Sequence, residues 1–198
     1  KAGCWQQTLD IETAPGGSVA LLLCALGRCV DRIVVADETL PPALLSAYRL
    51  YDSNLGELRD LLFPDPGSES RNFELAVGRL FTFLGFKVDV LTRSKVLRQA
   101  VDVIAVTPDD ANVLAIECTS LGINSDDKLG KLQARLEVIR RGLGEYNVIG
   151  LMITALERSG ILEANLQAAA QNGIVVLSRE DLDDLFEMIE VGRQSEEA

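Results

Sequence analysis

The feature that most constrains the fold is the alternation of helix-like and strand-like segments from residue 71 onward. Apolar residues at three- and four-residue spacing mark the helical segments, which are 71–84, 128–143 and 161–171. Short apolar runs mark the strand segments, which are 86–91, 101–106, 113–118, 148–154 and 174–177. Ser178, with Asp181 three residues later, has the spacing of a capping box and predicts a final acidic helix. This order predicts an α/β domain with a mixed sheet and helices on both faces.

A linker-like segment precedes this region. Residues 63–70 gather two prolines, a glycine and polar side chains, which is typical of a linker. Before it, turn residues separate three expected short strands over 5–13, 18–26 and 29–37, although a helix over 19–26 is an open alternative. Residues 41–62 have a helical pattern. We therefore expect a small N-terminal segment of strands and helix over 1–66, followed by the α/β domain over 67–198.

The composition excludes several kinds of chemistry. The chain contains no histidine, and its four cysteines form no CxxC pair. Histidine-based nucleophilic mechanisms are therefore excluded and a structural zinc site is disfavoured, which leaves carboxylate, lysine and hard-metal chemistry. Free cysteines of this kind indicate a cytoplasmic protein. No apolar run approaches the roughly 20 residues that a membrane span needs. The first residue is Lys1 rather than methionine, so we expect the chain to be a piece of a larger protein.

The net charge of −11 disfavours a general nucleic-acid coat protein, because such binding depends on neutralising phosphates. The charge is unevenly distributed, however. Residues 179–198 contain 8 acidic and 2 basic residues, whereas residues 67–178 contain 13 acidic and 12 basic residues. The middle of the chain is therefore close to neutral and remains compatible with a nucleic-acid substrate.

Two carboxylates lie within otherwise apolar strand segments. Asp102 is in 101–106 and Glu117 is near the end of 113–118. The turn residues Pro108-Asp109-Asp110 predict that these strands form a hairpin, so the carboxylates can converge at one end of the sheet. Burying them is costly unless a cation satisfies them, and carboxylate oxygens suit magnesium or manganese. The alternative is that each carboxylate simply ends its strand at the solvent edge.

Four short motifs follow one another along the chain: Asn72-Phe73-Glu74, Gly85-Phe86-Lys87-Val88, Val101-Asp102-Val103-Ile104-Ala105 and Ile116-Glu117-Cys118-Thr119. In their order and spacing they resemble the PD-(D/E)xK nuclease superfamily, which has the restriction-endonuclease-like fold, and in particular its Mrr-type branch. The similar order of elements continues through the strand at 174–177 and the closing helix. The resemblance thus covers about two-thirds of the chain.

The resemblance implies metal-dependent hydrolysis of phosphodiester bonds. Asp102 and Glu117 would bind Mg²⁺ or Mn²⁺, with the backbone carbonyl of Cys118 as a further ligand. The metal would lower the pKa of a bound water and polarise the phosphate. Glu74 matches an acidic position that completes the site in many members. Its alternative explanation is an acid near a helix N-terminus, favoured by the helix dipole.

The chain departs from the family pattern at one position. The family has a lysine two residues after the acidic residue, and Thr119 stands there in this chain. Some members move the lysine to the following helix, where this chain has Lys128 and Lys131, with Arg135 one further turn along. We expect Lys131 or Lys128 to orient the attacking water or to stabilise charge on the phosphate. If both are ordinary surface residues, the domain is catalytically inactive.

A second basic set surrounds the first helix and the loop before Asp102, and it is suited to phosphate contacts or to ordinary solvation. Its members are Arg71, Lys87, Arg93, Lys95 and Arg98. Three functional hypotheses follow: an active nuclease, with DNA as the expected substrate and a homodimer as one possible assembly; a non-catalytic binding or scaffolding module; and an unrelated α/β domain with incidental acids.

Overall fold

The computed structural model describes residues 18–25, 28–36, 43–64, 70–91, 100–123 and 127–191. The chain divides into two compact units, one ending at Pro41 and one beginning at Pro42. The first unit contains an antiparallel hairpin of β1 (Ser18–Ala25) and β2 (Arg28–Ala36). Two of the three expected N-terminal strands are thus confirmed, and the alternative helix over 19–26 is wrong. The third expected strand, over 5–13, lies outside the described residues.

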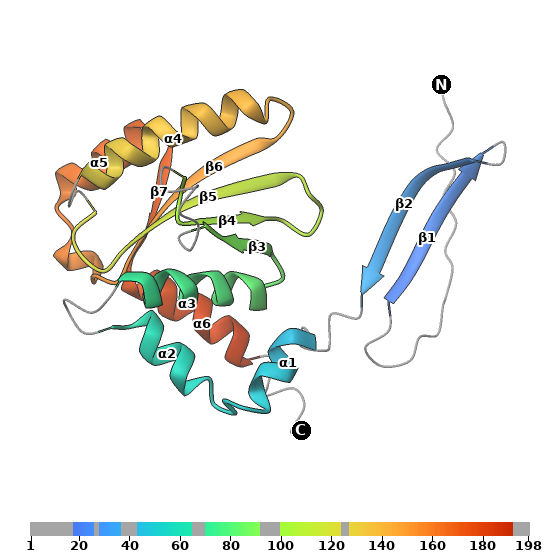
Figure 1. Ribbon diagram of the computed structural model, residues 1–198, viewed down its shortest axis with the longest axis horizontal. Helices are drawn as coiled ribbons and strands as arrows, with labels where there is room; N and C mark the ends of the chain where they lie inside the picture. The colour runs from blue at the N-terminus through green and yellow to red at the C-terminus, as the bar shows by residue number, and fades with distance from the viewer. Residues whose placement is uncertain are drawn as a thin grey trace. The chain divides into compact units, whose positions relative to one another are not determined.

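The second unit is an α/β fold around a five-stranded mixed, open sheet (Figure 1). Its strands, in spatial as well as chain order, are β3 (Lys87–Val90), β4 (Val103–Val106), β5 (Asn112–Thr119), β6 (Asn147–Thr154) and β7 (Ile174–Leu177). The first three strands are antiparallel neighbours, and β5, β6 and β7 pair in parallel. Helices separate the parallel strands, as crossover connections require. The expected α/β class and mixed sheet are confirmed.

The β4–β5 hairpin sets the geometry of the candidate site. Its turn forms as the Pro108-Asp109-Asp110 signal predicts, and Asp110 adopts a positive φ of 60° within it. Val103 pairs with Ile116 in the ladder. Extending this antiparallel register by one residue places Asp102 opposite Glu117, on the same face of the sheet. Asp102 itself precedes β4, because the strand begins at Val103, two residues later than the expected start at residue 101.

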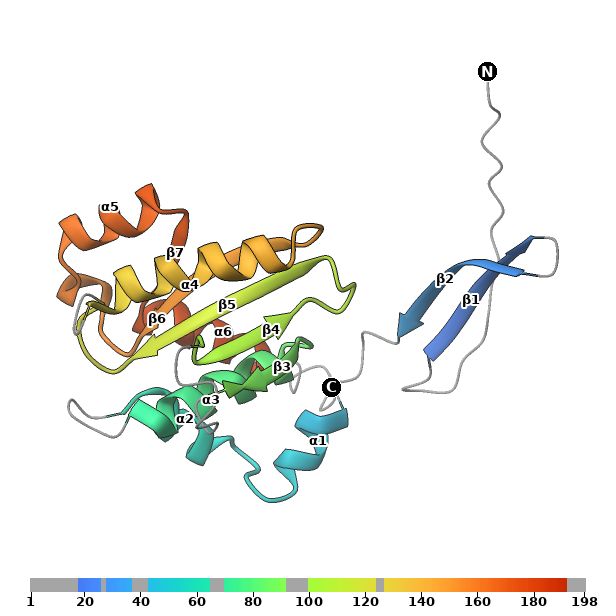
Figure 2. The same ribbon diagram turned by 45° about the horizontal axis from the view of Figure 1, so that its top comes forward.

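One face of the sheet is covered by α3 (Ser70–Phe83) and α6 (Arg179–Val191), as Figure 2 also shows. The apolar stripe of α3 is fully buried at Phe73, Val77 and Leu80, and Gly85, at a φ of 91°, follows the helix. A Cβ atom added at Gly78 would lie 2.5 Å from Val90 Cγ2, so this glycine allows the helix to approach β3 closely.

The opposite face is covered by α4 (Lys128–Gly142) and α5 (Glu163–Gln171), with a short 3-10 helix (Arg158–Gly160) after β6. The inner, buried stripe of α4 consists of Leu129, Leu132 and Leu136. This stripe packs with residues that alternate along β5 and β6, including Val113, Ala115 and Met152. The packing fixes which face of α4 is turned toward the sheet, and this is the face that carries the basic residues discussed below.

Two short helices before α3 belong to the second unit. These are α1 (Ala43–Arg49) and α2 (Gly56–Leu62), in place of the single helix expected over 41–62. The break occurs because Leu55 adopts a left-handed conformation, and the Asp52 carboxylate accepts the N–H groups of Gly56 and Glu57 at the start of α2.

The expected division at residue 66 also differs from the observed one, which falls after Pro41. Leu45, Leu58 and Leu62 are buried in the same core as α3 and α6, so apolar burial attaches both helices to the second unit. The linker-like composition of 63–70 marks a connection within this unit. None of the described helices is long and apolar enough to cross a membrane.

Candidate functional site

Asp102 lies at the entrance to β4, and its side chain is 14% exposed. Its Oδ2 accepts the backbone N–H of Cys118 at 2.8 Å, which ties the carboxylate to the end of β5. Burial raises the pKa of Asp102 above its usual value, while the Cys118 hydrogen bond and the charges of Lys128 and Arg135 oppose that rise. The hydrogen bond thus fixes the position of the carboxylate, and together with the two cations it offsets only part of the effect of burial on the pKa.

Glu117 projects from β5 toward α4 and is 5% exposed. Its Oε2 accepts a hydrogen bond from Arg135 Nη1, which also forms an ion pair with it. Burial raises the pKa of Glu117, and the neighbouring Asp102 charge raises it further, against the lowering effect of Arg135 and Lys128. Since one oxygen of each carboxylate lies within 4.0 Å of Lys128 Nζ, the two carboxylates share one site, as expected for the hairpin.

Helix α4 supplies the cations of this site. Lys128 and Arg135 are seven residues apart, which is about two helical turns, so both project from the same face. Lys128 Nζ donates a short hydrogen bond to the carbonyl oxygen of Cys118. The same Nζ lies 3.8 Å from Glu117 Oε1 and 4.0 Å from Asp102 Oδ2. The three oxygens that the sequence suggested as metal ligands therefore converge on one ammonium group.

The structure separates the two lysines that the sequence offered as substitutes. Lys128 reaches the carboxylates, whereas Lys131 is exposed and lines a groove of about 770 Å³ between α4 and β4. The lining of this groove is mainly apolar and includes Val101, Ile104 and Val138, with Arg135 at its border. Of the two lysines, Lys128 is therefore the one placed at the carboxylates.

Thr119 occupies the position of the family lysine and has another use. It is buried, and its Oγ1 both accepts the N–H of Leu121 at 3.1 Å and donates to the Leu121 carbonyl at 3.3 Å. Thr154, its partner on β6, donates to the same carbonyl at 3.1 Å. The two threonines thus fix the turn that follows β5.

Glu74 lies one turn inside α3, and its side chain is buried. An interaction with the helix dipole at an exposed first turn therefore does not explain this residue. Burial raises the pKa of the Cys118 thiol well above its usual value, and the charges of Asp102, Glu74 and Glu117 raise it further. Since Cys118 packs in the core that α3 covers, Glu74 approaches β5 from the face opposite Lys128.

The donor set suits a hard divalent cation in its chemistry. Mg²⁺ is commonly held by only one or two carboxylates and keeps several waters, so Asp102, Glu117 and the Cys118 carbonyl are sufficient in kind. Among the described residues, no group of three or more acidic, cysteine or histidine side chains is placed to hold a metal. A cation at this position would therefore depend on these two carboxylates, backbone oxygen and water.

The second basic set is only partly described. Lys87 forms an exposed ion pair with Asp110 at 2.6 Å, and Arg71 is exposed on α3. Arg93, Lys95 and Arg98 lie outside the described residues. The expected phosphate contacts of this set stay a prediction.

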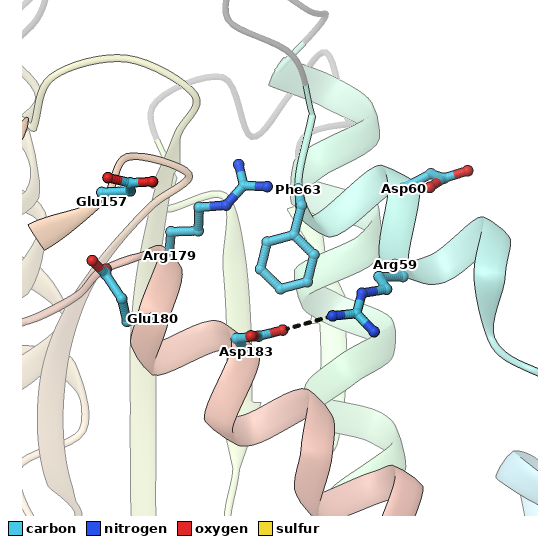
Figure 3. Close-up of a pocket in the computed structure, with 7 residues that line it drawn as sticks. All are labelled: Arg59, Asp60, Phe63, Glu157, Arg179, Glu180 and Asp183. Carbon is cyan, nitrogen blue, oxygen red and sulfur yellow. Dashed lines mark hydrogen bonds and ion pairs between the residues drawn. The ribbon is translucent and has the colours of Figure 1, made fainter.

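A separate hollow of about 390 Å³ lies where α2 approaches α6 (Figure 3). Arg59 bonds Asp183 at 3.3 Å, and the Arg179 guanidinium stacks over the Phe63 ring at 5.0 Å. Glu180 accepts the backbone N–H of Arg158. These groups join α2, α6 and the segment after β6 to one another, which is a structural role.

The sequence identified most residues of the candidate site, but it did not indicate that Arg135 pairs with Glu117. The signal was present, because a seven-residue spacing from Lys128 places both residues on one helical face.

No protein-family model matches this chain, and no curated protein matches it. The functional argument therefore depends on the geometry of the site.

Proposed function

We propose that the second unit is a metal-dependent nuclease of the restriction-endonuclease-like type, which hydrolyses phosphodiester bonds of nucleic acid, with DNA as the expected substrate. The observation that carries this proposal is the convergence of Asp102, Glu117 and the Cys118 carbonyl with Lys128 Nζ. The five-stranded mixed sheet with helices on both faces is compatible with that fold. Two opposed carboxylates, a backbone oxygen and a lysine are the groups that such hydrolysis requires.

Each residue would have a distinct task. Asp102 and Glu117 would hold a Mg²⁺ or Mn²⁺ ion, with the Cys118 carbonyl as a further ligand. When bound, the ion supplies a Lewis acid that lowers the pKa of a water and polarises the phosphate. The Cys118 N–H orients Asp102, and Arg135 holds Glu117 Oε2, so that Oε1 is turned toward Lys128.

Lys128 would replace the lysine that the strand lacks. Its ammonium is close enough to the carboxylates to reach a phosphate oxygen or an attacking water beside them. A positive charge there stabilises the charge that develops on the phosphate in the transition state. The nearby Lys131 would serve at most as a contact to the substrate backbone. Cleavage of both strands of a duplex would need two such sites, which a homodimer would provide.

One observation favours the second candidate, a non-catalytic binding or scaffolding module. Lys128 and Arg135 already neutralise Asp102 and Glu117, so the four side chains balance in charge without any metal. A fold that retained its carboxylates for stability alone would have this arrangement. The two candidates differ in whether the carboxylates are needed for turnover.

A cleavage assay tests the proposal. Plasmid DNA, single-stranded DNA and RNA are incubated with the full chain and with Mg²⁺ or Mn²⁺. We expect metal-dependent cleavage by the wild type, and a loss of at least about a hundredfold in Asp102→Asn, Glu117→Gln and Lys128→Met. The matched control is Arg141→Met, which removes a positive charge from the exposed end of the same helix. Absence of metal-dependent cleavage on all three substrates supports the non-catalytic module, and cleavage that survives Glu117→Gln rejects the site.

A further inference from the structure

The Lys128 ammonium lies where the proposed metal ligands converge. Its nitrogen bonds the Cys118 carbonyl and lies 3.8 Å and 4.0 Å from one oxygen each of Glu117 and Asp102. An ammonium is a compact cation, and its side chain here is only 21% exposed. Lys128 therefore provides the positive charge that these three oxygens would otherwise take from a metal.

A divalent ion could not share this position. Mg²⁺ binds oxygen at about 2.0–2.1 Å, so an ion bound to the same three oxygens would lie within a few ångströms of Nζ. The cluster already balances two negative charges with Lys128 and Arg135. Adding two positive charges without removing one would produce strong repulsion in a partly buried site.

The two cations of the cluster are not equivalent. Arg135 bonds Glu117 Oε2, which leaves Oε1 available to a second cation. Lys128 instead contacts all three candidate ligands, and it begins α4 at the helix's first residue. A flexible four-carbon side chain at a helix start can withdraw without any movement of the helix itself. Lys128 is thus the cation that a metal would displace.

We propose that the Lys128 ammonium and a divalent cation exclude one another at the oxygens of Asp102, Glu117 and Cys118, so that Lys128 occupies the site until a metal displaces it. This inference rests on the proposed metal site. It gives Lys128 two positions, one among the metal ligands and one withdrawn from them, and only in the withdrawn position would its charge act on the phosphate or water of the proposed function. Metal affinity is thereby set in part by the chain's own lysine.

Direct metal binding without nucleic acid tests the exclusion. Titration of the full chain with Mn²⁺, followed by the electron paramagnetic resonance signal of free Mn²⁺, gives the affinity of each variant. We expect Lys128→Met to bind at least about tenfold more tightly than the wild type, which corresponds to about 1.4 kcal/mol. Lys128→Arg keeps the charge and should show no such gain, and Arg141→Met should match the wild type. An affinity of Lys128→Met equal to or weaker than that of the wild type overturns the proposal.

A second measurement needs no change at Lys128 and covers the case in which Lys128→Met does not fold. Lysines of the wild type are acetylated with and without Mn²⁺, and the rate at each site is measured by mass spectrometry. Displacement should raise the rate at Lys128 relative to Lys87, which is exposed and paired with Asp110. The rise should vanish in Glu117→Gln. An unchanged or lower rate at Lys128 under saturating Mn²⁺ overturns the proposal.

The outcomes separate this inference from the proposed function. Tighter Mn²⁺ binding by Lys128→Met, with no cleavage by the wild type, supports exclusion and rejects the nuclease. Cleavage by the wild type with no gain in affinity rejects exclusion alone. If neither protein binds Mn²⁺, both the metal site and the exclusion fail.

Discussion

Thr119 shows how one residue changes the assignment of a site. In the family that this chain resembles, the position two residues after the acidic residue carries a lysine on the same face of the strand. Here the side chain is a buried threonine whose hydroxyl bonds both the N–H and the carbonyl of Leu121. The turn after β5 uses this position, and the ammonium that lies beside the two carboxylates is that of Lys128, from α4.

Replacing Thr119 by valine should therefore affect stability more than chemistry. The variant keeps the shape of the side chain but removes both bonds to Leu121, one of them to a backbone N–H. We expect a loss of about 1 kcal/mol in the free energy of unfolding, measured by urea denaturation. Thr119→Ser retains the hydroxyl and should lose less than half as much. Equal stability of Thr119→Val and the wild type would contradict this role.

The buried carboxylates should give stability a measurable pH dependence. Burial and the Asp102 charge raise the pKa of Glu117 above its usual 4.5, so the folded state binds this proton more tightly than the unfolded state does. The resulting stabilisation is present below about 4.5 and is lost as the pH rises through the higher folded-state pKa.

Glu117→Gln cannot titrate at this position. Without divalent metal, the unfolding free energy of the wild type minus that of Glu117→Gln should therefore decrease as the pH rises from about 4.5. Thermal or urea unfolding at a series of pH values measures this difference. A difference that increases over the same range would show that the ion pair with Arg135 outweighs burial.

The sequence predicted the types of residue in the candidate site and the pairing of its two carboxylates, but not which cation reaches them. The hairpin signal and period-two alternation were enough to place Asp102 and Glu117 together. These signals could not show whether Lys128 or Lys131 reaches the carboxylates, because both lysines share a helical face and the answer depends on the position of α4 along β5. The ion pair of Arg135 with Glu117 depends on the same position of α4.

At the scale of the element, α4 holds both cations of the candidate site, so its distance from the sheet matters. Gly150 in β6 allows the close approach, because an added Cβ would lie 2.4 Å from Leu136 Cδ1. Leu136 is itself buried in the core between α4 and the sheet. A side chain at residue 150 must therefore shift Leu136 or the helix that carries it.

Gly150→Ala should destabilise the protein by about 1–3 kcal/mol through overpacking. Leu136→Ala removes the obstructing methyl groups, so the double variant should be more stable than the sum of the two single losses predicts. Gly142→Ala is the matched control, since no atom lies within 4 Å of its added Cβ. The free energy of unfolding of these four variants and of the wild type is measured by urea denaturation. Strict additivity would show that Gly150 and Leu136 do not limit each other.

The elements themselves were predictable where a periodic pattern met a clear stop signal. Helix α3 with its Gly85 end, strand β7, and α6 with the Ser178 N–H bonded to Asp181 at 2.7 Å agree with expectation. In the region before α3 the leucine spacing continues across residues 50–55 and therefore predicts a single helix. The left-handed Leu55 and the bonds of Asp52 to α2 interrupt it, and neither leaves a periodic signal.

At the scale of the whole molecule, the order of elements determined the sheet more closely than it determined the function. β4 and β5, which a short turn joins, pair antiparallel, and the strands that helices separate, β5, β6 and β7, pair in parallel. β3 adds to the edge of this order by pairing antiparallel with β4, across the longer connection over 91–102. The same sheet can support many activities, so the function depends on the site. The domain boundary was less predictable, because a proline- and glycine-rich stretch connects parts within a unit as readily as it separates units.

The boundary can be tested by comparing two shortened chains, residues 42–198 and residues 67–198. The shorter chain lacks α1 and α2, whose Leu45, Leu58 and Leu62 are almost completely buried in the core shared with α3 and α6. Each such side chain contributes about 1.5–3 kcal/mol by burial, and a whole domain is stable by only about 5–15 kcal/mol. The chain from residue 42 should unfold in one cooperative thermal transition, whereas the chain from residue 67 should lose that transition or aggregate. Equal melting temperatures of the two would show that α1 and α2 are peripheral and that the unit begins after residue 66.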